Sequence, residues 1–294
     1  MPELPDITVY AESIERLLAD AVLQKILLPN MFILRTVDPP VNAFEGKRLQ
    51  RVGHIGKRIV LCFDGDLFAV VHLMIAGRFK WFAVGEKIPA TKLVLARLEF
   101  DRGTLALTEA GTKRRASLHL LRGRAALAAH DPGGIDPIES TLAQFSARLT
   151  RENHTLKRAL TDPRVFSGIG NAYSDEILHR AMLSPLALSQ KLSHAEIAKL
   201  HAATRDVLRE WLVRLRAETG DRFPEKVTAF RPEMAVHGKF KQPCPACGSL
   251  VQRILYADNE SNYCPTCQTG GKLLADRALS RLLKASWPKS ADDL

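Results

Sequence analysis

The fold of the second half of this chain is indicated by one stretch, Gly168-Ile169-Gly170-Asn171-Ala172-Tyr173-Ser174-Asp175-Glu176. It joins a glycine turn directly to a helical segment. Glycine adopts positive φ at little cost, so two glycines in three residues favour a tight turn. The first backbone amides of the following helix lack intrahelical partners, and such a helix start attracts a phosphate. A simple chain reversal is the more common use of a glycine turn, and the wider sequence has to separate the two interpretations.

Apolar residues with helical spacing flank this turn on both sides. They predict helices over residues 142–149, 156–160, 174–181 and 194–215. A turn-rich segment, Asp131-Pro132-Gly133-Gly134, precedes the first of these helices and marks a domain boundary. We therefore expect a helical domain over residues 131–235.

The first 130 residues have a different pattern. Residues 7–20 predict an amphipathic helix, and a β-rich region then runs from about residue 47 to 122. Asp64-Gly65-Asp66 and Asp101-Arg102-Gly103 are typical hairpin turns between short apolar runs. The individual strands are expected at residues 58–63, 67–72, 92–100 and 104–107. The pattern predicts an antiparallel β-sandwich or barrel with a helix at its N-terminus, spanning residues 1–130.

The charge balance favours a polyanionic partner. The chain has 42 Lys and Arg against 32 Asp and Glu, a formal net charge of +10, and each phosphate that a cation neutralises releases condensed counterions. Charge alone leaves a basic protein without a nucleic-acid partner equally open. The acidic opening lacks the basic flank of an export signal, and the longest apolar stretch, residues 67–76, is too short to span a bilayer. We expect a cytoplasmic protein with no membrane segment, associated with the nucleoid if the source is bacterial.

Four of the five cysteines form two matched pairs, Cys244-Pro245-Ala246-Cys247 and Cys264-Pro265-Thr266-Cys267. This spacing is typical of a tetrahedral site for one structural Zn²⁺, with residues 250–263 forming a hairpin between the pairs. Disulfides or redox dithiols are the alternative, which an intracellular location disfavours. Cys62 stands in an apolar β run and is interpreted as a buried thiol. We expect a four-cysteine zinc finger over residues 236–270 and a helical tail over residues 271–294.

Three motifs occur in a fixed order: Pro2-Glu3-Leu4-Pro5, the glycine turn continuing into Asp175-Glu176, and the four-cysteine finger. Together they resemble the formamidopyrimidine-DNA glycosylase and endonuclease VIII family, over residues 2–268. The resemblance implies an α+β multidomain fold with a catalytic β-sandwich, a helix–two-turn–helix domain and a zinc-finger hairpin. It also implies base-excision repair of damaged double-stranded DNA, bound between the domains, and we expect a monomer.

The resemblance implies a bifunctional enzyme in which Pro2 is the nucleophile. Removal of Met1 makes Pro2 a secondary amine, which attacks C1′ of the damaged nucleotide, expels the base and acidifies the C2′ proton. β-Elimination, and then δ-elimination, cleave the strand. Glu3 is expected to act as general acid and base. Without the resemblance, both residues would be an ordinary flexible terminus.

Further residues are assigned to DNA by the same resemblance. Lys57 corresponds to a hairpin lysine that grips the phosphate beside the lesion. Gly170 and Asn171 are expected to contact a DNA phosphate, and Lys157 is a further DNA-binding candidate. Ile75 stands at the family's intercalating methionine position, and Lys113-Arg114-Arg115 aligns with an Arg-Arg-Phe wedge.

Other departures concern Asp6, which stands where many relatives have glutamate, and Asn259, which stands where relatives place a finger arginine. An acidic hairpin tip, Asp258 to Glu260, is unexpected on a surface that faces DNA. Beyond the finger, Lys272, Arg277 and Arg281 add positive charge, and Arg277 is a candidate replacement for the missing arginine. A packing helix with a solvated basic face is the alternative interpretation of this tail.

Two other classes of protein are compatible with parts of the sequence. A catalytically silent binder of damaged or abasic DNA would keep the fold and the finger, but the presence of Pro2, Glu3 and Lys57 favours the enzyme. A zinc-finger transcription factor leaves the N-terminal motif unexplained. The motifs leave open whether the substrate is an oxidised purine, a formamidopyrimidine or an oxidised pyrimidine.

Overall fold

The computed structural model describes residues 1–89, 91–111, 113–225, 227–228, 231–256, 259–274 and 290. The chain divides into two compact units, residues 1–132 with 211–228, and residues 133–210 with 229–294. The long helix α6 (His194–Thr219) contributes residues to both. The predicted ranges assign residues 211–228 to the helical domain, whereas the structure packs them with the β unit. The reason is apolar burial and charge, since Phe223 and Val227 pack into the first core and Arg216 pairs with Glu12.

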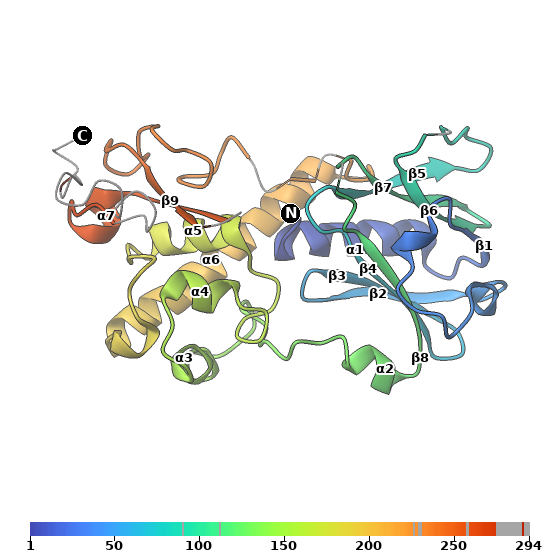
Figure 1. The fold of residues 1–294 in the computed structure, drawn as a ribbon, viewed down its shortest axis with the longest axis horizontal. Helices are drawn as coiled ribbons and strands as arrows, with labels where there is room; N and C mark the ends of the chain where they lie inside the picture. Colours follow the sequence, from blue (N-terminus) through green and yellow to red (C-terminus); the bar gives the residue numbers. More distant parts are fainter. Residues whose placement is uncertain are drawn as a thin grey trace. The chain divides into compact units, whose positions relative to one another are not determined.

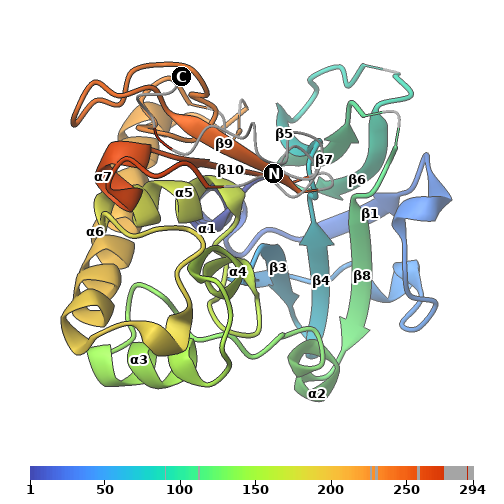
Figure 2. The ribbon, with the colours of Figure 1, turned by 60° about the vertical axis from the view of Figure 1, so that its left-hand side comes forward.

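The first unit is a sandwich of two four-stranded antiparallel sheets (Figures 1 and 2). One sheet has the order β1 (Leu23–Leu27), β6 (Val94–Phe100), β7 (Gly103–Glu109) and β5 (Gly77–Ala83). The other has the order β2 (Leu49–Ile55), β3 (Arg58–Phe63), β4 (Leu67–His72) and β8 (Ser117–Arg122). Short segments follow some strands: η1 (Met31–Ile33), η2 (Val41–Phe44) and α2 (Arg124–Ala128). The predicted β-sandwich is confirmed.

Helix α1 (Leu4–Leu18) begins three residues before the predicted start, because Pro5 is tolerated in the first turn of a helix. The helix lies against β2 and β3, and it buries Ile7, Tyr10 and Ile14 completely. The Tyr10 ring also meets the edge of Phe79, with ring centroids 5.8 Å apart. This packing fixes the first residues of the chain against the sandwich.

The second unit holds the helices α3 (Leu142–Thr150), α4 (Leu156–Thr161), α5 (Asn171–Arg180) and the first part of α6, with η3 (Ser189–Lys191) between them. The hairpin of β9 (Gln252–Tyr256) and β10 (Asn259–Tyr263) follows, and α7 (Pro265–Thr269) closes it. Phe145 and Phe166 stack at the centre of this unit, with ring centroids 4.5 Å apart. The predicted helices and the cysteine-bearing hairpin are therefore present.

The end of the chain bears on the predicted tail helix. Arg277 and Arg281 lie outside the described residues, while Lys272 forms an isolated antiparallel bridge with Ser290 and residues 271–274 are not helical. Across the described part of the chain, no helix combines the length and the apolar character needed to cross a membrane.

Candidate functional site

The N-terminal motif is built into the start of α1. Pro2 is buried, and Glu3 and Asp6 are each only 2% exposed. The Glu3 amide donates to Asp6 Oδ2 at 2.9 Å, and the Ile7 amide donates to the Glu3 carbonyl at 2.9 Å. Since Pro2 and Glu3 are ordered by helix capping and burial, they are not a flexible terminus.

Charged groups of the first unit surround the terminal amine. Burial lowers the pKa of the Met1 amine below its usual value of 8.0; the Glu3 carboxylate opposes this shift, and Arg78 adds to it. Asp6 and Lys57 make smaller contributions of opposite sign. The surroundings of the terminus therefore favour the neutral, nucleophilic form of an amine. With Met1 attached, the Pro2 nitrogen itself is an amide.

Lys57 lies in the tight turn between β2 and β3, where Ile55 and Arg58 are paired and Gly56 has φ 56°. The Lys57 side chain is half-buried. Next to it, Arg58 donates from its guanidinium to the His130 carbonyl at 3.3 Å. Arg58 also pairs across the strands with His72. Lys57 and Arg58 therefore place two cations at this end of the sheet.

The loop that follows β4 holds Ile75 at an exposed tip. Ile75 is 62% exposed, and the turn beneath it is closed by the Gly77 amide, which donates to the Leu73 carbonyl at 2.9 Å. Arg78 reinforces the turn by donating to the carbonyls of Ile75 and Gly77 at 3.0 and 2.6 Å. A Cβ on Gly77 would lie 2.2 Å from the Leu73 carbonyl oxygen, so this position requires glycine.

A second loop rises from the same place. Gly77 and Glu109 are paired across β5 and β7, so the loop that follows Glu109 starts beside the Ile75 loop. The Glu109 carboxylate is 1% exposed and accepts hydrogen bonds from the amides of Arg115 at 3.0 Å and Ala116 at 3.2 Å. These bonds anchor a loop whose Lys113, Arg114 and Arg115 are all exposed. The two predicted wedge segments, Ile75 and residues 113–115, therefore lie on loops that start beside each other.

In the second unit, the glycine turn leads into α5 as predicted, with Gly170 as N-cap and Asn171 as the first helical residue. The Lys157 ammonium donates to the Asn171 carbonyl at 2.7 Å and to Asp175 Oδ1 at 2.5 Å. Only 15% of the Lys157 side chain is exposed. In the structure the Lys157 ammonium is bound to α5 and orients the start of this helix, and the contact with DNA expected from the sequence stays a prediction.

Two buried acids of α5, to which the sequence analysis assigned no role, tie the finger to this helix. Asp175 accepts from the His237 ring at 2.8 Å and from the Asn262 amide at 3.0 Å. Glu176 accepts from the three consecutive amides of residues 235–237 at 2.7 to 2.9 Å. Burial disfavours the Asp175 carboxylate, but Lys157 and His237 outweigh it and hold its pKa below the usual value. The sequence signal that could have drawn attention to these residues is that they are two adjacent acids in an otherwise buried helix. Charged residues are seldom buried unless they are paired.

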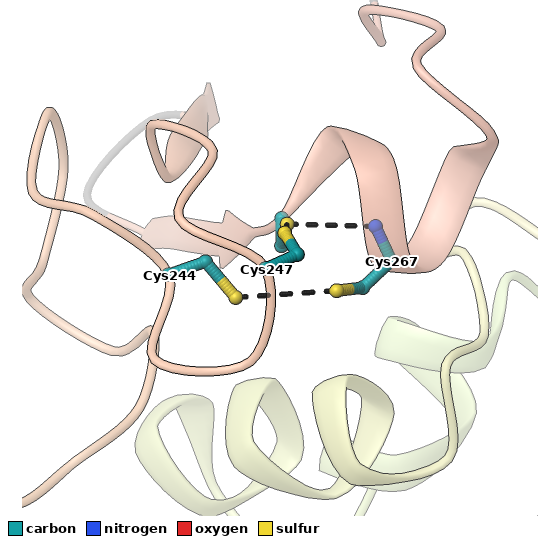
Figure 3. A group of neighbouring side chains, drawn as sticks. Cys244, Cys247 and Cys267 are labelled. Atoms are coloured by element: carbon teal, nitrogen blue, oxygen red, sulfur yellow. Dashed lines mark hydrogen bonds between the residues drawn. The ribbon is translucent and has the colours of Figure 1, made fainter.

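The four paired cysteines lie close together, and Figure 3 shows three of them, Cys244, Cys247 and Cys267, facing one another. Their Sγ atoms all lie within 4.8 Å of one another. Cys244 and Cys264 are buried, and the His179 Nε2 atom lies 3.2 Å from Cys244 Sγ. A metal ion bound by all four sulfurs as thiolates would have no position left for a substrate. The cluster can hold a metal ion.

Glu260, the acidic residue that was unexpected in the hairpin, forms an ion pair. Glu260 lies 3.4 Å from Arg253 on the facing strand, and the Arg253 guanidinium lies over the Phe240 ring at 4.3 Å from its centroid. Asn259 begins β10 opposite Tyr256, and Asp258 lies outside the described residues. The negative charge at Glu260 is therefore balanced within the hairpin.

Comparison with known proteins agrees with this architecture. A family model described as the formamidopyrimidine-DNA glycosylase N-terminal domain matches residues 1–117, and one described as the H2TH domain of the same glycosylase matches residues 134–220. A formamidopyrimidine-DNA glycosylase of Thermus thermophilus is 30% identical over 286 residues, which cover 92% of this chain and 100% of that protein. The chain belongs to the formamidopyrimidine-DNA glycosylase family, a family of DNA glycosylases.

More particular relatives can also be named. An uncharacterised formamidopyrimidine-DNA glycosylase-like protein of Mycobacterium tuberculosis is 42% identical over 151 residues, which cover 51% of this chain and 94% of that protein. The crystal structure of MutM (Fpg) from Thermus thermophilus has a TM-score of 0.75 at 28% identity, covering 91% of this chain and 98% of that one. A structure of MutM in complex with DNA containing carbocyclic 8-oxo-G has a TM-score of 0.80 at 21% identity, covering 91% and 100%, and it supports the fold.

Proposed function

We propose that this protein is a bifunctional DNA glycosylase and abasic-site lyase of base-excision repair, with the amine of Pro2 as its nucleophile. The observation that carries the proposal is the N-terminus itself: Pro2 and Glu3 are buried at the start of α1, where the environment lowers the pKa of a terminal amine. A protein that only bound DNA would have no use for a terminal amine whose neutral form is favoured by burial beside an acidic side chain.

The chemistry follows from a secondary amine beside a carboxylic acid. After Met1 is removed, the Pro2 nitrogen attacks C1′ and the glycosidic bond breaks, while Glu3 takes the proton from the attacking amine and passes it to the leaving base. The C1′–O4′ bond then opens with protonation of O4′, and the iminium ion that forms between Pro2 and C1′ acidifies the C2′ hydrogen. Loss of that proton expels the 3′ phosphate, and a second elimination expels the 5′ phosphate. Hydrolysis then releases Pro2.

DNA binding is proposed at two sets of groups, one in each unit. In the first unit, Lys57 would hold the phosphate beside the lesion, and Ile75 with Lys113 to Arg115 would fill the space that a flipped base leaves. In the second unit, Gly170 and Asn171 would hold another phosphate at the start of α5. The substrate class is damaged double-stranded DNA, as in the DNA complexes of structural neighbours.

The cysteine cluster is proposed to hold one Zn²⁺ in a structural role. Cys244, Cys247, Cys264 and Cys267 would bind it as thiolates. When bound, the ion supplies a cross-link between the two cysteine pairs and takes no part in the reaction. The His179 imidazole beside Cys244 Sγ is placed to support this ligand from α5.

Borohydride trapping on DNA with an abasic site tests the nucleophile, because a Schiff base is reducible. We expect the protein with a free Pro2 amine to form a covalent complex, Pro2→Gly to trap weakly, and a form that retains Met1 not to trap. Pro89→Gly, which alters an exposed loop proline, is the matched control and should trap like the wild type. Undiminished trapping by the Met1-retaining form would assign the nucleophile to another amine.

A further inference from the structure

A surface hollow in the first unit lies beside the exposed 113–115 loop. Its volume is about 670 Å³, and its walls come from the segment around η1, the start of β6 and Arg114. Of these walls, only Arg114 belongs to the candidate site described above. Phe32, Met31, Lys92 and Arg97 form the rest of the lining that matters here.

The turn at η1 holds the Phe32 side chain in solvent. Its side chain is 85% exposed and that of Met31 is 65% exposed, whereas the next residue, Ile33, is 2% exposed and anchors the turn in the core. The Asn30 side chain accepts from the Phe32 amide at 3.0 Å, and the Asn30 amide donates to the Leu95 carbonyl at 3.4 Å. A large aromatic side chain that is fixed and yet exposed is typical of a binding surface.

The hollow is also positively charged. Lys92, Arg97 and Arg114 line it, and none of the lining residues is acidic. The Arg97 Nε atom is buried and has no hydrogen-bond partner in the part of the chain that the structure describes. A flat aromatic face beside three cations matches a ligand with a flat base and an anionic phosphate, which is a nucleotide.

We propose that this hollow binds the nucleotide opposite the excised base, with its base stacked on Phe32 and its phosphate on Lys92 and Arg97. The inference rests on the proposed function and deepens it. Once a damaged base is flipped, the base opposite loses its partner, and a surface next to the loop that enters the stack can receive it. Arg114 belongs both to that loop and to the hollow, so it connects the two.

The test compares duplexes that carry a tetrahydrofuran abasic analogue. In one set a normal base lies opposite the analogue, and in the other a second tetrahydrofuran removes that base. Phe32→Ala should weaken affinity about tenfold in the first set, the value of one base on an aromatic ring, and should leave the second set unchanged. Phe32→Trp should keep the affinity and Phe32→Leu should lose it. Val37→Ala, which truncates a side chain that is 95% exposed outside the hollow, is the matched control.

Several outcomes would overturn the inference while leaving the proposed function intact. An equal loss in both sets would mean that Phe32 does not contact the opposite base. No loss in either set would assign the exposed aromatic to another partner, such as a protein. Arg97→Gln should make the slope of log affinity against log salt shallower by about 0.9, and an unchanged slope would remove Arg97 from the phosphate contact. If the wild type binds neither set, the proposed function itself fails and the inference fails with it.

Discussion

At the scale of single residues, the most specific prediction about the proposed reaction concerns Glu3. Glu3→Gln keeps the shape and burial of the side chain but removes its transferable proton, so base excision should fall by about 10² to 10⁴ while DNA affinity stays. Single-turnover excision and a binding assay measure the two effects. Glu12→Gln is the matched control, because Glu12 lies on the same helix in an exposed pair with Arg216 and should change neither. Excision at the wild-type rate would remove Glu3 from the mechanism.

His72 gives a prediction about pH. Burial first, and then the Arg58 guanidinium, lower the pKa of His72 to about 4. An unfolded histidine titrates near 6.5, so between about pH 6.5 and 4 the unfolded chain binds more protons than the folded protein. The stability that a neutral His72 contributes is therefore present above about pH 6.5 and is lost as the pH falls towards 4.

Chemical denaturation at pH 7.5 and pH 5 measures this effect, and His72→Gln should reduce the difference between the two free energies of unfolding. Burial also lowers the pKa of His119 and His130, so part of the dependence should persist in the variant. An NMR titration that finds a normal pKa for His72 would contradict the prediction.

At the scale of elements, the sequence predicted best where turns and apolar runs act locally. Strands β3 and β4 were predicted to the residue, because Asp64-Gly65-Asp66 separates two clean apolar runs. Strand β1 was not predicted, since two of its five residues are exposed in succession and break the alternation. The roles of Asp175 and Glu176 could not be predicted either, because their partners lie about 60 to 87 residues further along the chain. Spacing identified the cysteine cluster, because each pair positions its own thiols.

The loop that Glu109 anchors should matter for base excision but not for strand cleavage. Glu109→Gln removes the negative charge and replaces one of the two accepting oxygens by an NH₂ group, which cannot accept from the backbone amides of Arg115 and Ala116, so the anchor of the loop weakens. A hydrogen bond to a charged group is worth about 1.5 to 3 kcal/mol, so excision of a damaged base should fall at least tenfold. Cleavage of a preformed abasic site needs no base to be flipped and should change little.

The two activities can be measured on the same duplex, with and without the damaged base. Glu99→Gln, a change on the neighbouring strand β6, is the control and should leave both rates as they are. An equal loss of excision and cleavage would show that Glu109 supports the site in general rather than the loop that we propose to enter the base stack.

At the scale of the whole molecule, the chain is organised around segments that return to distant partners. Residues 211–228 come back to the first unit through Phe223 and Val227, and composition alone gave no sign of this packing. The finger returns to α5 in the same way, through Asp175, Glu176 and the contact of His179 with Cys244. Local patterns define the segments, but only these long-range contacts define the units.

Metal removal tests how the finger depends on its cross-link. We expect one zinc per chain in protein purified without chelator, and Cys247→Ser should weaken the site because it removes one of four donors. The hairpin would then loosen from α5, so DNA affinity should fall and proteolysis between residues 244 and 267 should speed up. Borohydride trapping at saturating DNA should persist, because the finger takes no part in the proposed reaction at Pro2. Cys62→Ser, in the first unit and apart from the cluster, is the matched control and should change none of these readouts. Metal-free protein that binds DNA with full affinity would show that the four cysteines hold the hairpin without an ion.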